Sequence, residues 1–137
     1  MRPGAGPGDP EAVKSRILVA DDDPVVVQLV SATLRAKGYE IIPVFDAMQA
    51  VMFALKTPPP DAIVLDIKMP GGGTGVDTIK RLKSSRKTAL IPIIILSGST
   101  DPDMPDKVRA AGAVAYLGKP VDPAALCQTL ETVLGEP

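Results

Sequence analysis

A three-layer α/β/α sandwich around a five-stranded parallel sheet is the fold class that this sequence predicts. Five short apolar segments alternate with five segments of helical periodicity along the 137 residues. Such alternation is typical of a parallel sheet that is covered by helices on both faces. Hydrophobic residues make up 45% of the chain, which is sufficient for one domain with a substantial core.

The strands are expected at the apolar segments. IPIIILSG is continuous and rich in β-branched residues, as expected of a strand buried on both faces. EIIPVF contains Pro43, which cannot donate a ladder hydrogen bond, so this segment is an edge-strand candidate. The predicted strands cover residues 16–20, 40–45, 62–66, 91–98 and 113–117.

Aspartates stand where three of the helices should begin. Asp23, Asp46 and Asp122 are predicted N-caps, and Pro24 follows at the first helical position. Gly38 is expected to end the first helix. The predicted helices cover residues 24–37, 46–56, 76–85, 107–111 and 122–134.

Two of these helices carry more specific expectations. One stripe of the first helix is expected to face the core, namely Val26, Leu29, Val30, Thr33 and Leu34. The segment STDPDMPD before the fourth helix contains two prolines, which predict that this helix is short or shifted.

Composition restricts the class of protein. The net charge is −1, so neither a nucleic-acid surface nor a membrane surface is expected. No apolar run approaches a membrane span, and the N-terminus lacks the apolar centre of a secretory signal. The single cysteine, Cys127, is expected in the core and fits a reducing compartment, so we expect a cytoplasmic protein. Residues 1–14 are predicted to be a flexible Gly/Pro-rich tail before a domain over 15–135.

Polar and charged residues follow the predicted strands at one edge of the sheet. Asp21 and Asp22 follow the first strand, and Asp66 ends the third. Ser97 ends the fourth strand, and Lys119 follows the fifth. Because ligands of such sheets bind beyond the carboxyl ends of the strands, these side chains are expected to share one crevice.

Three clustered carboxylates cannot all remain ionised without a cation nearby. The chain contains no histidine, so the cation should be one that prefers oxygen ligands, Mg²⁺ or Mn²⁺. A nucleophilic carboxylate, a metal, a hydroxyl and an ammonium together indicate a site that handles phosphoryl groups.

Four motifs in order carry a family resemblance: LVADDDP, IVLDIKMPG, IIILSG and YLGKP. Over about residues 15–135 the chain resembles a response-regulator receiver domain, the phosphoacceptor module of two-component signal transduction. This resemblance implies the flavodoxin-like (CheY-like) fold, a doubly wound (βα)5 arrangement.

The resemblance also implies a role for each matching residue. Asp66 matches the phosphoacceptor, and Asp21, Asp22, Asp66 and the backbone carbonyl of Lys68 match the metal ligands. Ser97 matches the switch hydroxyl, Tyr116 the switch aromatic, and Lys119 the phosphoryl-binding cation, with a cis bond to Pro120. By the same alignment Asp23 is a helix cap and not a ligand. The loop over 70–76 departs from the family pattern because it is one residue longer and lacks the usual acidic residue, so we expect it to be more mobile.

The implied function is a signalling switch. A sensor histidine kinase or a histidine phosphotransfer protein would donate the phosphoryl group to Asp66. The response would reach a downstream protein through the face of the fourth helix, fifth strand and fifth helix. We expect no enzyme activity beyond phosphotransfer to itself and autodephosphorylation, no DNA-binding output domain in this chain, and a monomer or a phosphorylation-dependent dimer.

Two other classes of protein share parts of this pattern. A phosphatase of the haloacid dehalogenase type uses a D-x-D motif, which Asp21 and Asp23 would fit, but it predicts a longer chain with a second acidic motif near the C-terminus. A flavodoxin-like FMN-binding protein shares the sheet, but three clustered carboxylates would repel the FMN phosphate, and aromatic residues are only 3% of the chain.

Overall fold

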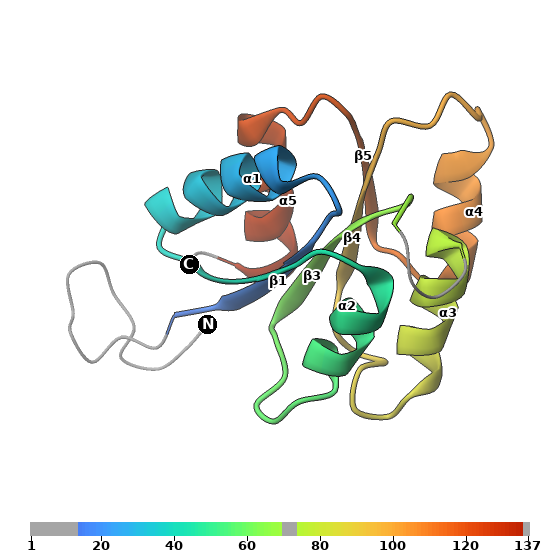
Figure 1. Ribbon diagram of the computed structural model, residues 1–137, viewed down its shortest axis with the longest axis horizontal. Coiled ribbons are helices and arrows are strands. Elements are labelled where there is room, and N and C mark those ends of the chain that lie inside the picture. Colours follow the sequence, from blue (N-terminus) through green and yellow to red (C-terminus); the bar gives the residue numbers. More distant parts are fainter. Residues whose placement is uncertain (1–13, 70–73, 136–137) are drawn as a thin grey trace.

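The computed structural model describes residues 14–69 and 74–135. Within that part of the chain, five parallel strands form one sheet in the order β2-β1-β3-β4-β5. Figure 1 shows the sheet between helices on both faces, which confirms the predicted fold class. The strands are β1 (Arg16–Ala20), β2 (Glu40–Val44), β3 (Ala62–Asp66), β4 (Ile93–Ser97) and β5 (Ala115–Gly118).

The helices divide the core into two layers. They are α1 (Pro24–Ala36), α2 (Ala47–Ala54), α3 (Gly75–Ser84), α4 (Met104–Ala111) and α5 (Pro123–Leu134). Leu18, Ile63 and Ile95 pack in the layer that contains side chains of α2, α3 and α4. Ile17, Val64 and Ile94 pack with α1 and α5. None of the described helices is long and apolar enough to cross a membrane.

Strand position follows the sequence pattern. β3 and β4 are buried along their whole length, as their continuous apolar sequences predict. β2 lies at the edge of the sheet beside β1, with Pro43 opposite Val19. The edge position that Pro43 predicted is therefore confirmed.

Four of the helices have a side-chain cap at their N-terminus. Asp23 Oδ1 accepts a hydrogen bond from the Val25 amide at 2.9 Å, and Asp46 and Asp122 cap α2 and α5 in the same manner. These three caps were predicted. The capping box of α3 was not: Thr74 Oγ1 accepts from the Asp77 amide at 3.1 Å, and Asp77 Oδ2 accepts from the Thr74 amide at 3.2 Å.

The structure corrects two helix predictions. In α1 the buried residues are Val27, Val30, Ser31 and Leu34, whereas Leu29 is 49% exposed. The spacing i, i+3, i+4, i+7 from Val27 describes the buried stripe, so the predicted stripe was rotated toward solvent. α4 begins at Met104, before the predicted 107, because Pro105 is tolerated in a first helical turn. The predicted mobility of the tail at 1–13 and of the longer loop at 70–73 lies outside the described residues.

A half-buried lysine joins α3 to the segment before β4. Lys83 Nζ donates hydrogen bonds to the carbonyl oxygens of Ala89 at 3.0 Å and Ile91 at 2.8 Å. Its stem lies against Gly112, where an added Cβ would be 2.7 Å from Lys83 Cγ. Burial lowers the pKa of the Lys83 ammonium. Lys83 therefore connects the ends of α3 and α4 with the start of β4.

Gly75 provides a test of the packing under the candidate site. A Cβ at this position would lie 2.3 Å from the carbonyl oxygen of Ile67, in the residue after Asp66. We expect Gly75→Ala to lower the free energy of unfolding by about 1–3 kcal/mol, since backbone must move to accept the methyl group. This loss opposes the better helix propensity of alanine.

Chemical denaturation measures this change, with Gly98→Ala as the control. A Cβ at Gly98 would meet the Cβ of Lys119 at an ordinary 4.0 Å, so its substitution should cost less. Equal losses in the two variants would contradict the steric explanation.

Candidate functional site

The ends of β1, β3 and β4 bring three polar side chains together. Asp21 directly follows β1, while Asp66 and Ser97 are the last residues of β3 and β4. These strands are parallel neighbours, so their carboxyl ends meet at one edge. The three residues are only 1%, 4% and 2% exposed, respectively. Asp22 lies beside them and is exposed to solvent.

The carboxylates of Asp21, Asp22 and Asp66 form a cluster. One oxygen from each lies within 4.8 Å of the others. Mg²⁺ binds oxygen ligands at about 2.0–2.1 Å, so this donor set fits a hard divalent cation after a small contraction. Asp23 is not in the cluster because its Oδ1 caps α1. Lys68 contacts the cluster through its amide nitrogen, 3.3 Å from Asp66 Oδ1, and metal binding by its carbonyl stays a prediction.

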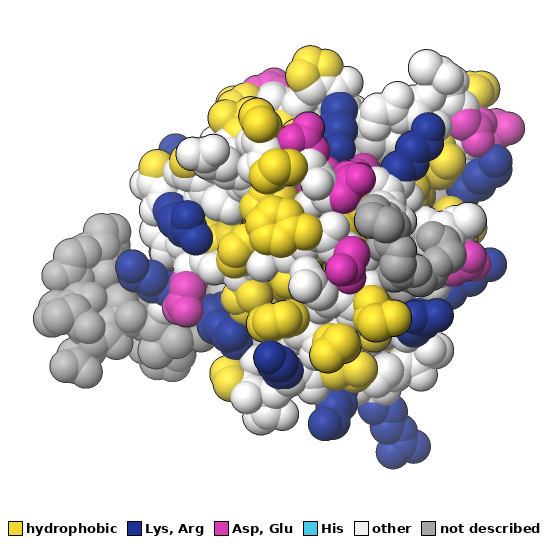
Figure 2. Space-filling view, in the orientation of Figure 1, with side chains coloured by type: hydrophobic (Ala, Val, Ile, Leu, Met, Phe, Trp, Pro, Cys, Tyr) yellow, Lys and Arg dark blue, Asp and Glu magenta, His cyan; other side chains and the backbone are white. Residues whose placement is uncertain are grey.

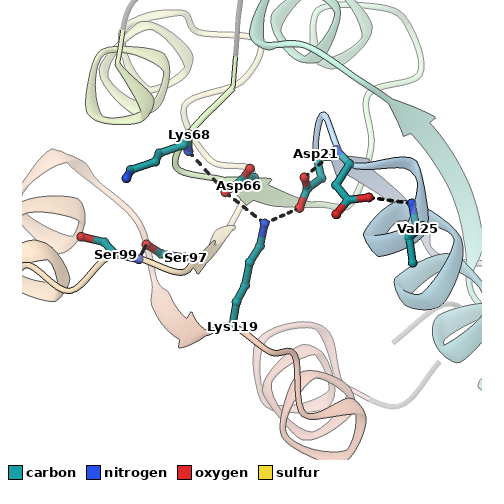
Figure 3. Close-up of polar contacts among 8 residues, drawn as sticks. Asp21, Val25, Asp66, Lys68, Ser97, Ser99 and Lys119 are labelled. Atoms are coloured by element: carbon teal, nitrogen blue, oxygen red, sulfur yellow. Dashed lines mark hydrogen bonds and ion pairs between the residues drawn. The ribbon is translucent and has the colours of Figure 1, made fainter.

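Lys119 reaches into this cluster from the end of β5. Its Nζ lies 2.7 Å from Asp21 Oδ2 and 3.3 Å from Asp66 Oδ1 (Figure 3). Its amide donates to the Ser97 carbonyl oxygen at 2.8 Å, which holds this part of the chain against β4. The bond to Pro120 is cis, as the family resemblance implied.

The charges of the cluster do not balance. Burial, followed by the charge of Asp21, raises the pKa of the Asp66 carboxyl above its ordinary value. The Lys68 amide and the Lys119 ammonium offset this rise only in part. Burial alone would lower the pKa of Lys119, but its hydrogen bond to Asp21 and the charges of both aspartates raise it. The cluster therefore retains surplus negative charge that favours a further cation.

Ser97 connects the cluster to α4. Ser97 Oγ accepts a hydrogen bond from the Ser99 amide at 3.0 Å, and Ser99 Oγ accepts from the Asp101 amide at 3.1 Å. Asp101 in turn accepts from the Asp103 amide and forms an ion pair with Lys107 at 2.7 Å. Consecutive turns therefore link Ser97 to the first turn of α4. Sequence reasoning did not identify these turns, although serine and aspartate at alternate positions are typical of them.

Tyr116 lies apart from the polar contacts of the cluster. It is half-buried on β5 and packs against the core layer of α2, α3 and α4. The described hydrogen bonds of the carboxylates do not include its hydroxyl group. Its role as a switch aromatic remains a prediction.

A cavity of about 540 Å³ opens beside the cluster. Asp22 and Lys68 provide its charged groups, and Met69, Val76 and Met104 are among its apolar residues. A crevice at this edge was expected, but the apolar walls of this cavity were not, because they come from separate segments with no shared periodicity. The Lys68 side chain extends away from Asp66 in Figure 3.

Sequence comparisons identify relatives of known class. The family model for the response regulator receiver domain matches residues 17–131. The chain is 34% identical to protein PilH of Pseudomonas aeruginosa over 122 residues, which cover 88% of this chain and 98% of PilH. It is 34% identical to the transcriptional regulatory protein PdtaR of Mycobacterium tuberculosis over 121 residues, which are 88% of this chain and 57% of PdtaR. The chain thus spans little more than half the length of several relatives that it matches.

Solved structures agree with this comparison. Chemotaxis response regulator CheY4 of Vibrio cholerae has a TM-score of 0.81 at 33% identity, over 89% of this chain and all of CheY4. The receiver domain of sensor histidine kinase PA1611 from Pseudomonas aeruginosa, with magnesium in its active-site cleft, has a TM-score of 0.80 at 30% identity. That likeness covers 90% of this chain and 99% of the other. With the sheet order, the acidic cluster and the family match in agreement, this chain belongs to the response regulator receiver domain family.

Proposed function

We propose that Asp66 accepts a phosphoryl group from a phosphohistidine of a sensor histidine kinase or a histidine phosphotransfer protein. The observation that carries this proposal is the position of Asp66, buried at the end of β3, where the Lys119 ammonium bridges its carboxylate and that of Asp21. Membership of the receiver domain family makes phosphorylation-based signalling the general function.

The chemistry requires one bond to form and one to break. An oxygen of Asp66 attacks phosphorus as the bond from phosphorus to the histidine nitrogen breaks, and the imidazole leaves with the bonding electron pair. Because the other ring nitrogen carries a proton, the released imidazole is neutral. Lys119 Nζ and Ser97 Oγ then contact oxygens of the transferred group, which requires Lys119 to exchange part of its present contact with Asp66.

A bound Mg²⁺ or Mn²⁺ would neutralise negative charge that accumulates on the phosphoryl oxygens. Asp21, Asp22 and Asp66 would hold it, with the carbonyl of Lys68 as a further ligand. Magnesium in the cleft of the PA1611 receiver domain supports this assignment.

The output would follow from the same contacts. When Ser97 turns toward the phosphoryl group, its hydrogen bond from the Ser99 amide is lost and the turns before α4 rearrange. Tyr116 would move inward, and a downstream protein would read the changed face of α4, β5 and α5. The chain acts in this proposal as a switch and catalyses only its own phosphotransfer and autodephosphorylation.

The phosphatase alternative lacks structural support. Its D-x-D motif would need Asp21 and Asp23 together in the site, whereas Asp23 Oδ1 receives the Val25 amide as the cap of α1. The described structure therefore favours the pair Asp21 and Asp22 over the pair Asp21 and Asp23.

The phosphoacceptor assignment is tested with a small phosphodonor and Mg²⁺. Wild type should gain one phosphoryl group per chain, labile to base and to hydroxylamine, by intact mass. Asp66→Asn should gain none, because it lacks the nucleophilic oxygen. Full labelling of Asp66→Asn would contradict the assignment.

Asp22 and Asp23 are adjacent carboxylates with different expected roles. Asp22→Ala should lose Mg²⁺ binding, measured by titration calorimetry, while the protein stays folded. Asp23→Ala should retain Mg²⁺ binding and phosphorylation, but its free energy of unfolding should fall by about 0.5–2 kcal/mol through loss of the cap. The opposite pattern would show that the metal ligands are wrongly assigned.

The surplus charge at Asp66 predicts an unusual stability effect. Without divalent metal at pH 7, Asp66→Asn should be at least as stable as wild type, since it removes an ionised carboxylate that burial disfavours. Folding raises the pKa of the Asp66 carboxyl above its ordinary value of 3.8. The free energy of unfolding of wild type therefore falls as pH rises from 3.8 through the pKa of the folded state, because the buried carboxyl then has to ionise. The stability advantage of Asp66→Asn should therefore shrink toward pH 4.

With Mg²⁺ present, wild type should become more stable than Asp66→Asn. It binds the folded wild type and raises its melting temperature by mass action, and it should raise that of Asp66→Asn much less. Thermal melts of both proteins with and without millimolar Mg²⁺ make the comparison. Equal shifts would mean that Asp66 is not a ligand.

A further inference from the structure

Exposed hydrophobic side chains gather on one side of the molecule, away from the expected output face. Six of the eight large hydrophobic residues that the described structure exposes lie on α1, on α2 or next to them. We call this surface the β2-edge face: Val25, Leu29, Phe45, Met48, Met52 and Leu55. The remaining two, Leu90 and Val114, lie outside it.

The β2-edge face is a continuous surface. β2 is an edge strand, with α1 in one core layer and α2 in the other. Figure 2 shows hydrophobic side chains from α1, past the edge of the sheet, to α2. Met48 and Met52 are 57% and 56% exposed, and Phe45 is 45% exposed. Contiguous apolar surface of this kind is typical of protein interaction sites.

Charged residues border this surface in an ordered way. At the carboxyl end of the strands lie Asp22, Asp23 and Asp46, near the first turns of α1 and α2. At the opposite end lie Arg35, Lys37 and Lys56, near the last turns of the same helices. Glu40 is an acidic exception at the basic end. Figure 2 shows acidic side chains on one side of the hydrophobic residues, with lysine and arginine mainly on the other.

This arrangement is complementary to itself. A two-fold axis that lies in the interface, perpendicular to the direction of β2, would set the β2 strands of two copies antiparallel. The acidic border of each copy would then face the basic border of the other, while the hydrophobic residues meet between them. Pro43 removes an amide donor from the strand edge, so side-chain packing and not sheet extension would join the copies.

We propose that the occupant of the β2-edge face is a second copy of this chain, in a symmetric dimer that forms without phosphorylation. The hydrophobic residues supply the buried area, and the two borders determine the antiparallel orientation. The proposal does not depend on Asp66 as phosphoacceptor, because none of its contacts requires a phosphoryl group.

Sedimentation velocity of the full chain tests the proposal, without phosphodonor and from about 5 to about 500 µM, a range that detects micromolar dissociation constants. Wild type should show a reversible monomer–dimer equilibrium. Met48→Glu/Met52→Glu should sediment as a monomer throughout. Leu90→Glu/Val114→Glu is the matched control: it places two charges on exposed hydrophobic positions outside the face and should dimerise like wild type. Circular dichroism and melting curves verify that each variant is folded.

A second pair of variants tests the borders. Arg35→Glu/Lys37→Glu should weaken dimerisation by at least tenfold, because acidic groups would then face acidic groups. Lys80→Glu/Arg81→Glu makes the same change of charge on exposed positions of α3 and should leave the dissociation constant unchanged within threefold.

Several results would overturn the proposal. These are a monomer at every concentration, a dimer that forms only after phosphorylation, or a dimer that persists in folded Met48→Glu/Met52→Glu. Equal weakening by the two charge-reversal pairs would show that net charge and not the borders governs association. A β2-edge face that binds a different protein while the chain stays monomeric would likewise overturn it.

Discussion

Negative charge held out of water at the ends of two neighbouring strands is the constraint on which this site depends. Asp21 and Asp66 are almost fully buried, and one ammonium, that of Lys119, serves both. Burial of an ionised carboxylate costs several kcal/mol unless it is compensated. The remaining negative charge would favour a divalent cation, and the charges of both carboxylates hold the Lys119 ammonium in place.

Much of this fold could be predicted from sequence, because its signals are local. The apolar runs of β3 and β4 are too short for a buried helix and therefore favour strands, and Pro43 restricts β2 to an edge. Asp23, Asp46 and Asp122 cap their helices through contacts two or three residues away, so their neighbours in the chain contain the necessary information. The convergence of Asp21 and Asp66 follows from strand direction alone once the sheet is known to be parallel.

The incorrect or missing predictions depend on contacts between distant segments. Leu29 fits an apolar stripe as well as Val27 does, and only the packing of α1 on the sheet decides between them. The meeting of Lys119 with the carboxylates was expected from the strand ends, but its direct 2.7 Å contact with Asp21, 98 residues away in the chain, has no local signal. The cavity beside Met104 depends on how α4 packs near α3, which the prolines before α4 do not determine.

The contacts of Lys83 make the two ends of α4 mechanically unequal. The end at Gly112 rests on the lysine stem, which the carbonyls of Ala89 and Ile91 hold in place. The starting end lacks a side-chain hydrogen bond from its N-cap, Asp103. The end at Gly112 is thus held by a half-buried lysine, whereas the first turn, with Met104 beside the cavity, is held by the solvent-exposed ion pair of Lys107 and Asp101.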